Sequence, residues 1–133
     1  MSSTAITQSL ELASERGDPT PLIYAKVFAA HPETEALFWR DADGSVRANM
    51  LAEVVTAVLD FVEGDAYGGN ILRIEAVNHE NLGVPPVVFR AFFVAMRDTL
   101  REILEREWTP EFEAAWRALL LRIDGVLSEK TRP

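Results

Sequence analysis

The chain has 133 residues, of which 48% are hydrophobic, and a formal net charge of -8 at pH 7. This length and apolar content predict a single domain over residues 1–133 with a buried core. The negative charge argues against nucleic acid as a partner, and the absence of cysteine excludes disulfides, thiolate nucleophiles and cysteine-ligated metals. No leader pattern and no apolar run of roughly 20 residues is present, so we expect a cytoplasmic protein that does not contact a membrane.

Proline and glycine divide the first part of the chain. Residues 17–21 (Gly-Asp-Pro-Thr-Pro) form a helix boundary, because proline disfavours helical geometry in the residue before it and suits the first turn of a new helix. Apolar spacing then predicts a helix over about 20–30, which His31-Pro32 interrupts. A short segment follows with Leu37, Phe38 and Trp39. Two helices are therefore expected to meet at a sharp corner.

The middle of the chain predicts a long helix and a shorter one. Residues 41–45 have turn chemistry, and after them apolar residues recur every four positions, at Met50, Val54, Val58 and Val62. The glycine-rich stretch 64–69 is interpreted as the turn that closes this helix, and residues 70–81 as a shorter helix that includes His79. Gly83 is a stop signal for that shorter helix.

The last part of the chain predicts two more helices. Apolar residues from Pro85 to about Trp108 have helical spacing. Thr109 is a plausible N-cap for the final helix, with Pro110 in its first turn. Strand alternation is not evident anywhere, so the fold class is expected to be all-α, with six to seven helices.

His79 is one of only two histidines, and its local sequence has a simple explanation. A cation near the C-terminus of a helix interacts favourably with the helix dipole, by about 0.3–1 kcal/mol. Other chemistry is poorly supported: acidic residues are scattered as on solvated helix faces, Gly68-Gly69 lacks the strand and lysine of a phosphate loop, and no serine occupies a nucleophile turn.

The order of residues around His79 adds a second explanation. The pattern His79-x-x-x-Gly83-Val84, followed by proline and by Phe89 early in a long apolar helix, resembles the proximal-histidine corner of globins. Upstream, the stretch 24–38, with Tyr24, Phe28, Pro32 and Phe38, is similar to the globin passage from the second helix through the short third helix. Downstream, 108–116 looks like the start of the terminal helix in single-domain bacterial globins. The resemblance covers roughly residues 20–125.

The resemblance implies a globin-like fold that encloses a haem pocket, with haem b as cofactor and His79 as the iron ligand. It implies an acceptor for the second imidazole nitrogen, expected to be a backbone carbonyl near Glu75 or Ala76. One axial histidine leaves the sixth position open for a diatomic gas such as oxygen, nitric oxide or carbon monoxide. The residues implied to contact the cofactor are Phe38, Arg40, Met50, Val54, Val58, Val84 and Phe89.

Two of the implied roles have alternatives. By position, Arg40 resembles the globin partner of the haem propionates, with Arg73 as a weaker candidate, but either can be a plain surface charge. Tyr24 occupies the place of a distal tyrosine, whose phenol donates a hydrogen bond to the bound gas; the less favoured alternative is a core tyrosine with its hydroxyl satisfied elsewhere.

The remaining distal position is open between two residues. Counting back from His79 puts it at Met50, or at Asn49 if the turn around Gly68 has an extra residue. The other histidine, His31, precedes a proline at the helix corner and is expected to be a surface or capping residue.

The chain departs from the family pattern at Glu75, where an apolar residue is more usual. The tyrosine and glutamate that hydrogen-bond the proximal histidine of flavohaemoglobins are not found; Phe89 and the apolar face of Phe112, Trp116 and Leu120 stand there instead. This departure counts against strongly peroxidase-like or fast dioxygenase chemistry. The 133 residues include no flavin or nicotinamide domain, so we expect redox turnover to need a separate reductase.

Three functions follow from the resemblance. The favoured one is reversible binding of oxygen or another diatomic gas. The alternatives are a nitric oxide dioxygenase supported by a reductase, and a haem-free sensory or interaction module. Apolar residues on the last two helices, including Phe92, Phe93 and Trp116, indicate either a homodimer or two buried faces within one small domain.

Overall fold

Helices make up all the regular secondary structure of the residues that the structure describes. The structure is a computed structural model, and it describes the backbone of residues 2–130 and the side chains of residues 5–128. The elements are α1 (Ser2–Glu15), α2 (Thr20–Ala30), the 3-10 helix η1 (Pro32–Phe38), α3 (Ser45–Glu63), α4 (Gly68–Asn81), α5 (Pro86–Leu104), the 3-10 helix η2 (Glu105–Glu107) and α6 (Pro110–Lys130). The prediction of an all-α fold is therefore confirmed. Over residues 2–130, no helix has the length and apolarity needed to cross a membrane.

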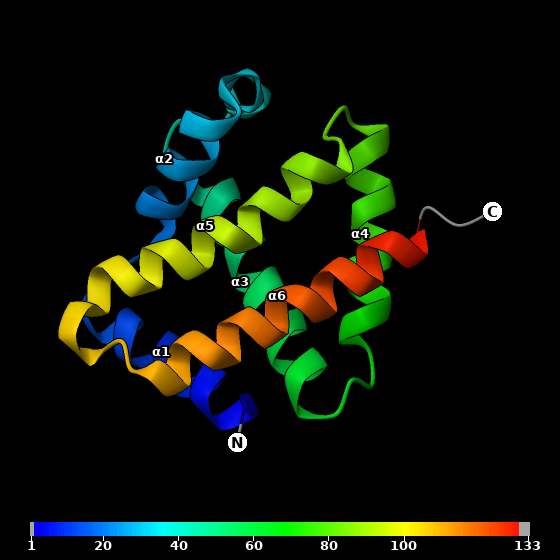
Figure 1. Cartoon of the computed structure of the whole chain (residues 1–133). Helices are drawn as coiled ribbons and strands as arrows, with labels where there is room; N and C mark the ends of the chain where they lie inside the picture. Colours follow the sequence, from blue (N-terminus) through cyan, green and yellow to red (C-terminus); the bar gives the residue numbers. More distant parts are fainter. Residues whose placement is uncertain (1, 131–133) are drawn as a thin grey trace.

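The helices pack around a core built on α5 and α6, which are neighbours running in opposite directions (Figure 1). Helix α1 packs against α6, α2 crosses α5, and α4 contacts both α3 and α6. Trp116 of α6 is fully buried, and its indole N–H donates a hydrogen bond of 2.9 Å to the Ser9 hydroxyl of α1. Phe93 is also buried, and Phe92 is half-buried. The aromatic residues that raised the question of a homodimer thus pack inside this chain.

The corner between α2 and η1 forms as the sequence predicts. The ring of Pro32 prevents α2 from continuing, so the helix ends at Ala30. The His31 carbonyl then accepts hydrogen bonds from the backbone N–H and the hydroxyl of Thr34, at 3.0 and 2.8 Å. This turn directs η1 back toward α2 and brings Phe38 within 5.5 Å of Tyr24, ring centre to ring centre.

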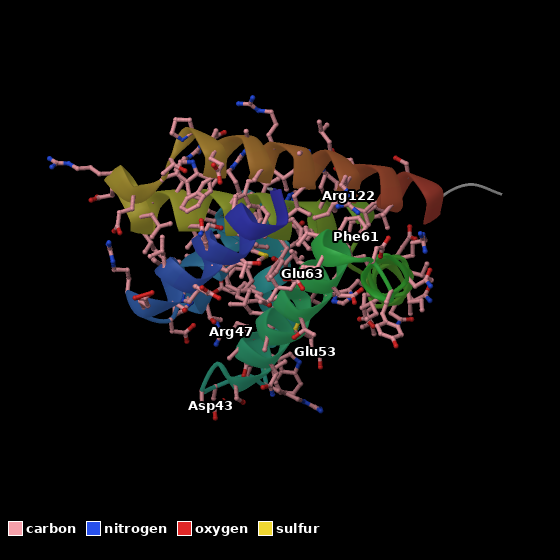
Figure 2. All side chains as sticks on the ribbon, turned by 90° about the horizontal axis from the view of Figure 1, so that it is seen from below. Asp43, Arg47, Glu53, Phe61, Glu63 and Arg122 are labelled. Carbon is pink, nitrogen blue, oxygen red and sulfur yellow. The ribbon has the colours of Figure 1, made fainter. Side chains whose placement is uncertain are left out.

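Helix α3 is anchored at both ends. At its start, the buried carboxylate of Asp41 accepts hydrogen bonds from the backbone N–H groups of Val46 and Arg47 and from the Arg47 guanidinium. Near its end, the Arg122 guanidinium of α6 donates to the Phe61 carbonyl at 3.1 Å and lies 4.1 Å from the centre of the Phe61 ring (Figure 2). These contacts fix the helix that provides one wall of the cavity described below.

Helix α4 begins at Gly68, two residues before the predicted start at Asn70. The interpretation of Gly68-Gly69 as a turn is therefore wrong: both glycines are helical. The Asp60 carboxylate accepts hydrogen bonds from the N–H groups of Tyr67 and Gly68, at 2.7 and 2.6 Å, and so satisfies the helix start. A Cβ at Gly68 would lie 2.4 Å from the Ala57 carbonyl oxygen, so α3 and α4 approach closely only because this side chain is absent.

Helix α5 ends at Leu104 and not near Trp108 as predicted. Glu105 adopts φ 47° and ψ -106°, which a continuing α-helix cannot accommodate, and the short η2 follows. Thr109 behaves as predicted, because its hydroxyl accepts a hydrogen bond of 3.0 Å from the Phe112 N–H. The predicted stop after α4 also holds, with Gly83 at φ 96°.

Candidate functional site

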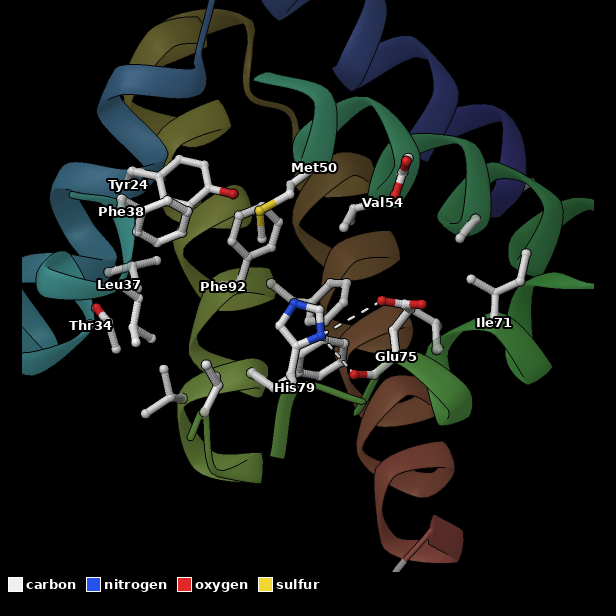
Figure 3. Close-up of a pocket in the computed structure, with 18 residues that line it drawn as sticks. Tyr24, Thr34, Leu37, Phe38, Met50, Val54, Ile71, Glu75, His79 and Phe92 are labelled. Atoms are coloured by element: carbon white, nitrogen blue, oxygen red, sulfur yellow. Dashed lines mark hydrogen bonds and ion pairs between the residues drawn. The ribbon is translucent and has the colours of Figure 1, made fainter. Parts of the chain in front are cut away.

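A cavity of about 180 Å³ lies between α2, η1, α3, α4 and α5 (Figure 3). Its walls are mostly aliphatic and aromatic, with His79, Glu53, Glu75, Thr34 and the hydroxyl of Tyr24 as the polar exceptions. The predicted site residues that line it are Tyr24, Phe38, Met50, Val54, His79, Val84 and Phe89. An apolar cavity with a few convergent polar groups is the usual form of a cofactor or small-molecule site.

The imidazole of His79 has a defined orientation. Its Nδ1 lies 2.7 Å from the backbone carbonyl oxygen of Glu75, one helical turn earlier on α4. Because a carbonyl only accepts, Nδ1 must carry the proton, and the neutral ring has its lone pair on Nε2. Figure 3 shows this second nitrogen on the cavity side, away from Glu75. The ring also contacts Phe89, at 5.1 Å between ring centres. His79 thus presents one ring nitrogen, free to act as an acceptor or a ligand, to a mostly apolar space.

Tyr24 belongs to an aromatic cluster at the α2 side of the cavity. Its ring is 5.8, 5.5 and 5.4 Å from those of Phe28, Phe38 and Phe92, respectively. The residue is only 3% exposed, and its hydroxyl has no hydrogen-bond partner among the described residues. Burial raises the pKa of the Tyr24 phenol well above its ordinary value, although the Arg47 charge opposes this. The hydroxyl is therefore a protonated and unused donor at the cavity.

Helix α3 presents Met50, not Asn49, to the cavity. Met50 is half-buried and lines the cavity, with its side chain directed inward near Tyr24 and Phe92 (Figure 3). Asn49 is exposed, and it is not among the lining residues. Of the two candidates for the distal position, Met50 is the one that reaches this space.

Three predicted cofactor contacts lie elsewhere. Val58 is fully buried in the core and does not line the cavity. Arg40 is exposed and places its guanidinium 4.5 Å from the centre of the Trp39 ring, outside the lining. Arg73, the weaker propionate candidate, bonds Asn70 on its own helix. The three therefore do not join the residues around His79.

Several lining residues were not predicted from the sequence to be site residues. They are Val27, Thr34, Leu37, Glu53, Ala57, Ile71, Leu72, Val88, Phe92 and Phe93. Helical periodicity could have found many of them, because Val27 follows Tyr24 by three residues, Phe92 follows Phe89 by three, and Leu72 precedes His79 by seven.

Comparisons with known proteins agree with this architecture. The family described as Globin matches residues 22–127, which include α3–α5 and the cavity residues named above. The chain is 30% identical over 112 residues to hemoglobin subunit zeta of Homo sapiens, a match that spans 80% of this chain and 78% of the human protein. Hemoglobin subunit zeta of Pan troglodytes matches with the same identity and the same spans. This chain belongs to the globin family.

Proposed function

We propose that this globin binds haem b in the cavity, with His79 Nε2 as the iron ligand, and that it reversibly binds oxygen or another diatomic gas. The observation that carries the proposal is the 2.7 Å hydrogen bond from His79 Nδ1 to the Glu75 carbonyl. This bond holds the imidazole in the tautomer that a metal requires and directs the ligating nitrogen to the apolar side.

The residues around the cavity fit a large apolar disc with a single metal at its centre. When bound, haem supplies an iron whose sixth coordination position accepts a small gas. Met50 and Val54 of α3 bound one side, while His79 and Phe89 bound the other. Phe38 and Val84 add further apolar side chains to the same lining. The chain's own residues would thus hold the haem, orient the imidazole of His79 and provide apolar contacts.

Tyr24 is proposed to be the donor to the gas. A buried hydroxyl without a partner is unfavourable, and it becomes favourable when an acceptor arrives. Because burial raises its pKa, the phenol keeps its proton at ordinary pH and can only strengthen binding by donation. Tyr24 would therefore slow the release of a gas that accepts hydrogen bonds, such as oxygen.

The test is a titration of the purified protein with hemin, followed by reduction and exposure to carbon monoxide, beside His79→Ala and His31→Ala. His31 is the matched control, since it is the other histidine and caps α2 outside the cavity. We expect a sharp Soret band that shifts with carbon monoxide in the parent and in His31→Ala, and a weakened or displaced band in His79→Ala.

If all three proteins give only the broad absorbance of free hemin, the proposal fails and a haem-free module becomes the better account. Steady-state consumption of nitric oxide with an added reductase distinguishes the dioxygenase: rapid turnover would replace reversible gas binding as the function.

A further inference from the structure

Glu75 approaches the imidazole of His79 with two different oxygen atoms. Its backbone carbonyl accepts the Nδ1 hydrogen bond at 2.7 Å, and its carboxylate oxygen Oε2 lies 3.7 Å from the same nitrogen. Figure 3 marks both interactions with dashed lines that meet at this nitrogen. The carbonyl is the hydrogen-bond acceptor, because 3.7 Å is too long for a hydrogen bond, so the carboxylate acts on the ring through its charge.

The carboxylate also contacts a neighbour on α4. Its other oxygen, Oε1, accepts a long hydrogen bond of 3.4 Å from the side-chain amide of Asn78. Glu75 also lines the cavity, and its side chain is 44% exposed, so it is not simply extended into solvent. One oxygen is thus directed to Asn78 and the other to His79.

A negative charge beside a metal-ligating histidine has a defined electronic effect. It increases the basicity of the imidazole as a ligand, and it stabilises the more positively charged state of the metal. Glu53 provides the natural comparison, because it is the other glutamate that lines the cavity and the structure gives it no contact with His79. A general effect of negative charge in the cavity should involve both glutamates, whereas an effect through the imidazole should involve only Glu75.

We infer that Glu75 is a positioning residue that makes His79 a stronger electron donor and favours the ferric state of the iron it holds. The inference rests on the proposed function, since it requires haem ligated by His79. Removing the charge in Glu75→Gln should raise the ratio of ferrous to ferric protein at a fixed potential about tenfold, an effect of the same order as the roughly 10- to 100-fold losses of metal affinity or activity that follow removal of such outer partners. For a one-electron couple this corresponds to an upward shift of about 59 mV.

The experiment compares the hemin-reconstituted parent with Glu75→Gln and Glu53→Gln. Spectroelectrochemical titration measures the midpoint potential, and resonance Raman spectroscopy of the ferrous protein measures the iron–histidine stretching frequency. We expect Glu75→Gln to raise the potential and to lower the stretching frequency, and Glu53→Gln to change both much less. Glutamine matches glutamate in shape, and position 75 is half-exposed, so the variant should fold like the parent.

The outcomes separate this inference from the proposed function. If the parent takes up haem through His79 but Glu75→Gln leaves the potential and the frequency unchanged, only the role of Glu75 is overturned. Equal shifts in Glu75→Gln and Glu53→Gln also overturn it, because they would show a general charge effect. A parent that takes up no haem overturns both proposals, and its Soret region reveals this before any potential is measured.

Discussion

Replacing Tyr24 by phenylalanine should have opposite effects on the haem-free protein and on the gas-bound protein. The Tyr24 hydroxyl is buried without a partner among the described residues, a state that costs about 1–3 kcal/mol. Phenylalanine keeps the ring contacts with Phe28, Phe38 and Phe92 and removes only the hydroxyl. The free energy of unfolding of the haem-free variant should therefore rise, by about 1 kcal/mol or more.

In the gas-bound protein the same substitution should remove the proposed hydrogen-bond donor to the gas. A neutral hydrogen bond contributes about 0.5–1.5 kcal/mol, so the dissociation rate of oxygen should increase about 2- to 10-fold. Urea denaturation measures the first effect and stopped-flow displacement of oxygen by carbon monoxide the second. Tyr67→Phe is the matched control, because Tyr67 is the other tyrosine and is 69% exposed.

A haem-free Tyr24→Phe protein that is less stable than the parent would contradict this prediction, since the hydroxyl would then have a stabilising partner. Equal rates of oxygen release from the variant and the parent would also contradict it, as would a Tyr67→Phe protein that reproduces either change.

Three further predictions concern the scaffold and its dependence on pH. Gly68→Ala should lower the free energy of unfolding, measured in urea, by about 1–3 kcal/mol, because the new Cβ would clash with the Ala57 carbonyl oxygen. Gly125→Ala is the control and should raise the free energy of unfolding by about 0.5–1 kcal/mol, because its Cβ would meet no atom within 4 Å. Equal changes in the two variants would contradict the packing of α4 on α3. Burial favours the protonated form of Asp41, but hydrogen bonds from α3 to the carboxylate outweigh this effect and hold the pKa of Asp41 below its ordinary value of 3.8. The ionised carboxylate therefore stabilises the fold above pH 3.8, and this stabilisation is lost as the pH falls below that value. Asp41→Asn should be less stable than the parent at neutral pH and lose less stability in acid, and parallel acid-unfolding curves would contradict this. The pKa of Tyr24 is raised in the folded protein, so above the ordinary tyrosine value of 10.0 the unfolded chain loses its phenol proton first and the free energy of unfolding should fall. The fall should be smaller in Tyr24→Phe. An equal fall in the parent and in Tyr24→Phe would contradict this prediction.

Local chemistry allowed much of the fold to be predicted from the sequence. Pro32 ends α2 because its ring cannot continue a helix, Thr109 caps α6 through its hydroxyl, and Gly83 adopts the positive φ that follows α4. Each of these residues acts on its immediate neighbours, so its effect is visible without the rest of the molecule.

The helix boundaries were predicted wrongly where contacts distant in sequence, or an unusual backbone conformation, determine the position of the helix end. The start of α4 at Gly68 depends on the Asp60 carboxylate and on the close approach of Ala57, both on α3. The end of α5 depends on Glu105 adopting a positive φ, which glutamate seldom does and no glycine or proline announces.

Of the three residues of α3 predicted to contact the cofactor, the two nearer its start line the cavity and the third does not. Positions four residues apart drift by about 40° around a helix, because a turn has 3.6 residues. Met50 and Val54 therefore line the cavity, whereas Val58 has rotated into the core. Neighbouring residues differ by about 100°, so the choice between Met50 and Asn49 required the register that only the three-dimensional structure provides.

The most direct test of the central claim, that the imidazole at position 79 ligates haem iron, is chemical rescue of His79→Gly. The variant is reconstituted with hemin, reduced and exposed to carbon monoxide, with and without free imidazole, beside His31→Gly. We predict an altered Soret band without imidazole and a return to the parent's carbon monoxide spectrum when imidazole fills the space left by the side chain, with His31→Gly like the parent throughout. A His79→Gly spectrum that matches the parent without imidazole, or that imidazole does not restore, would contradict the account.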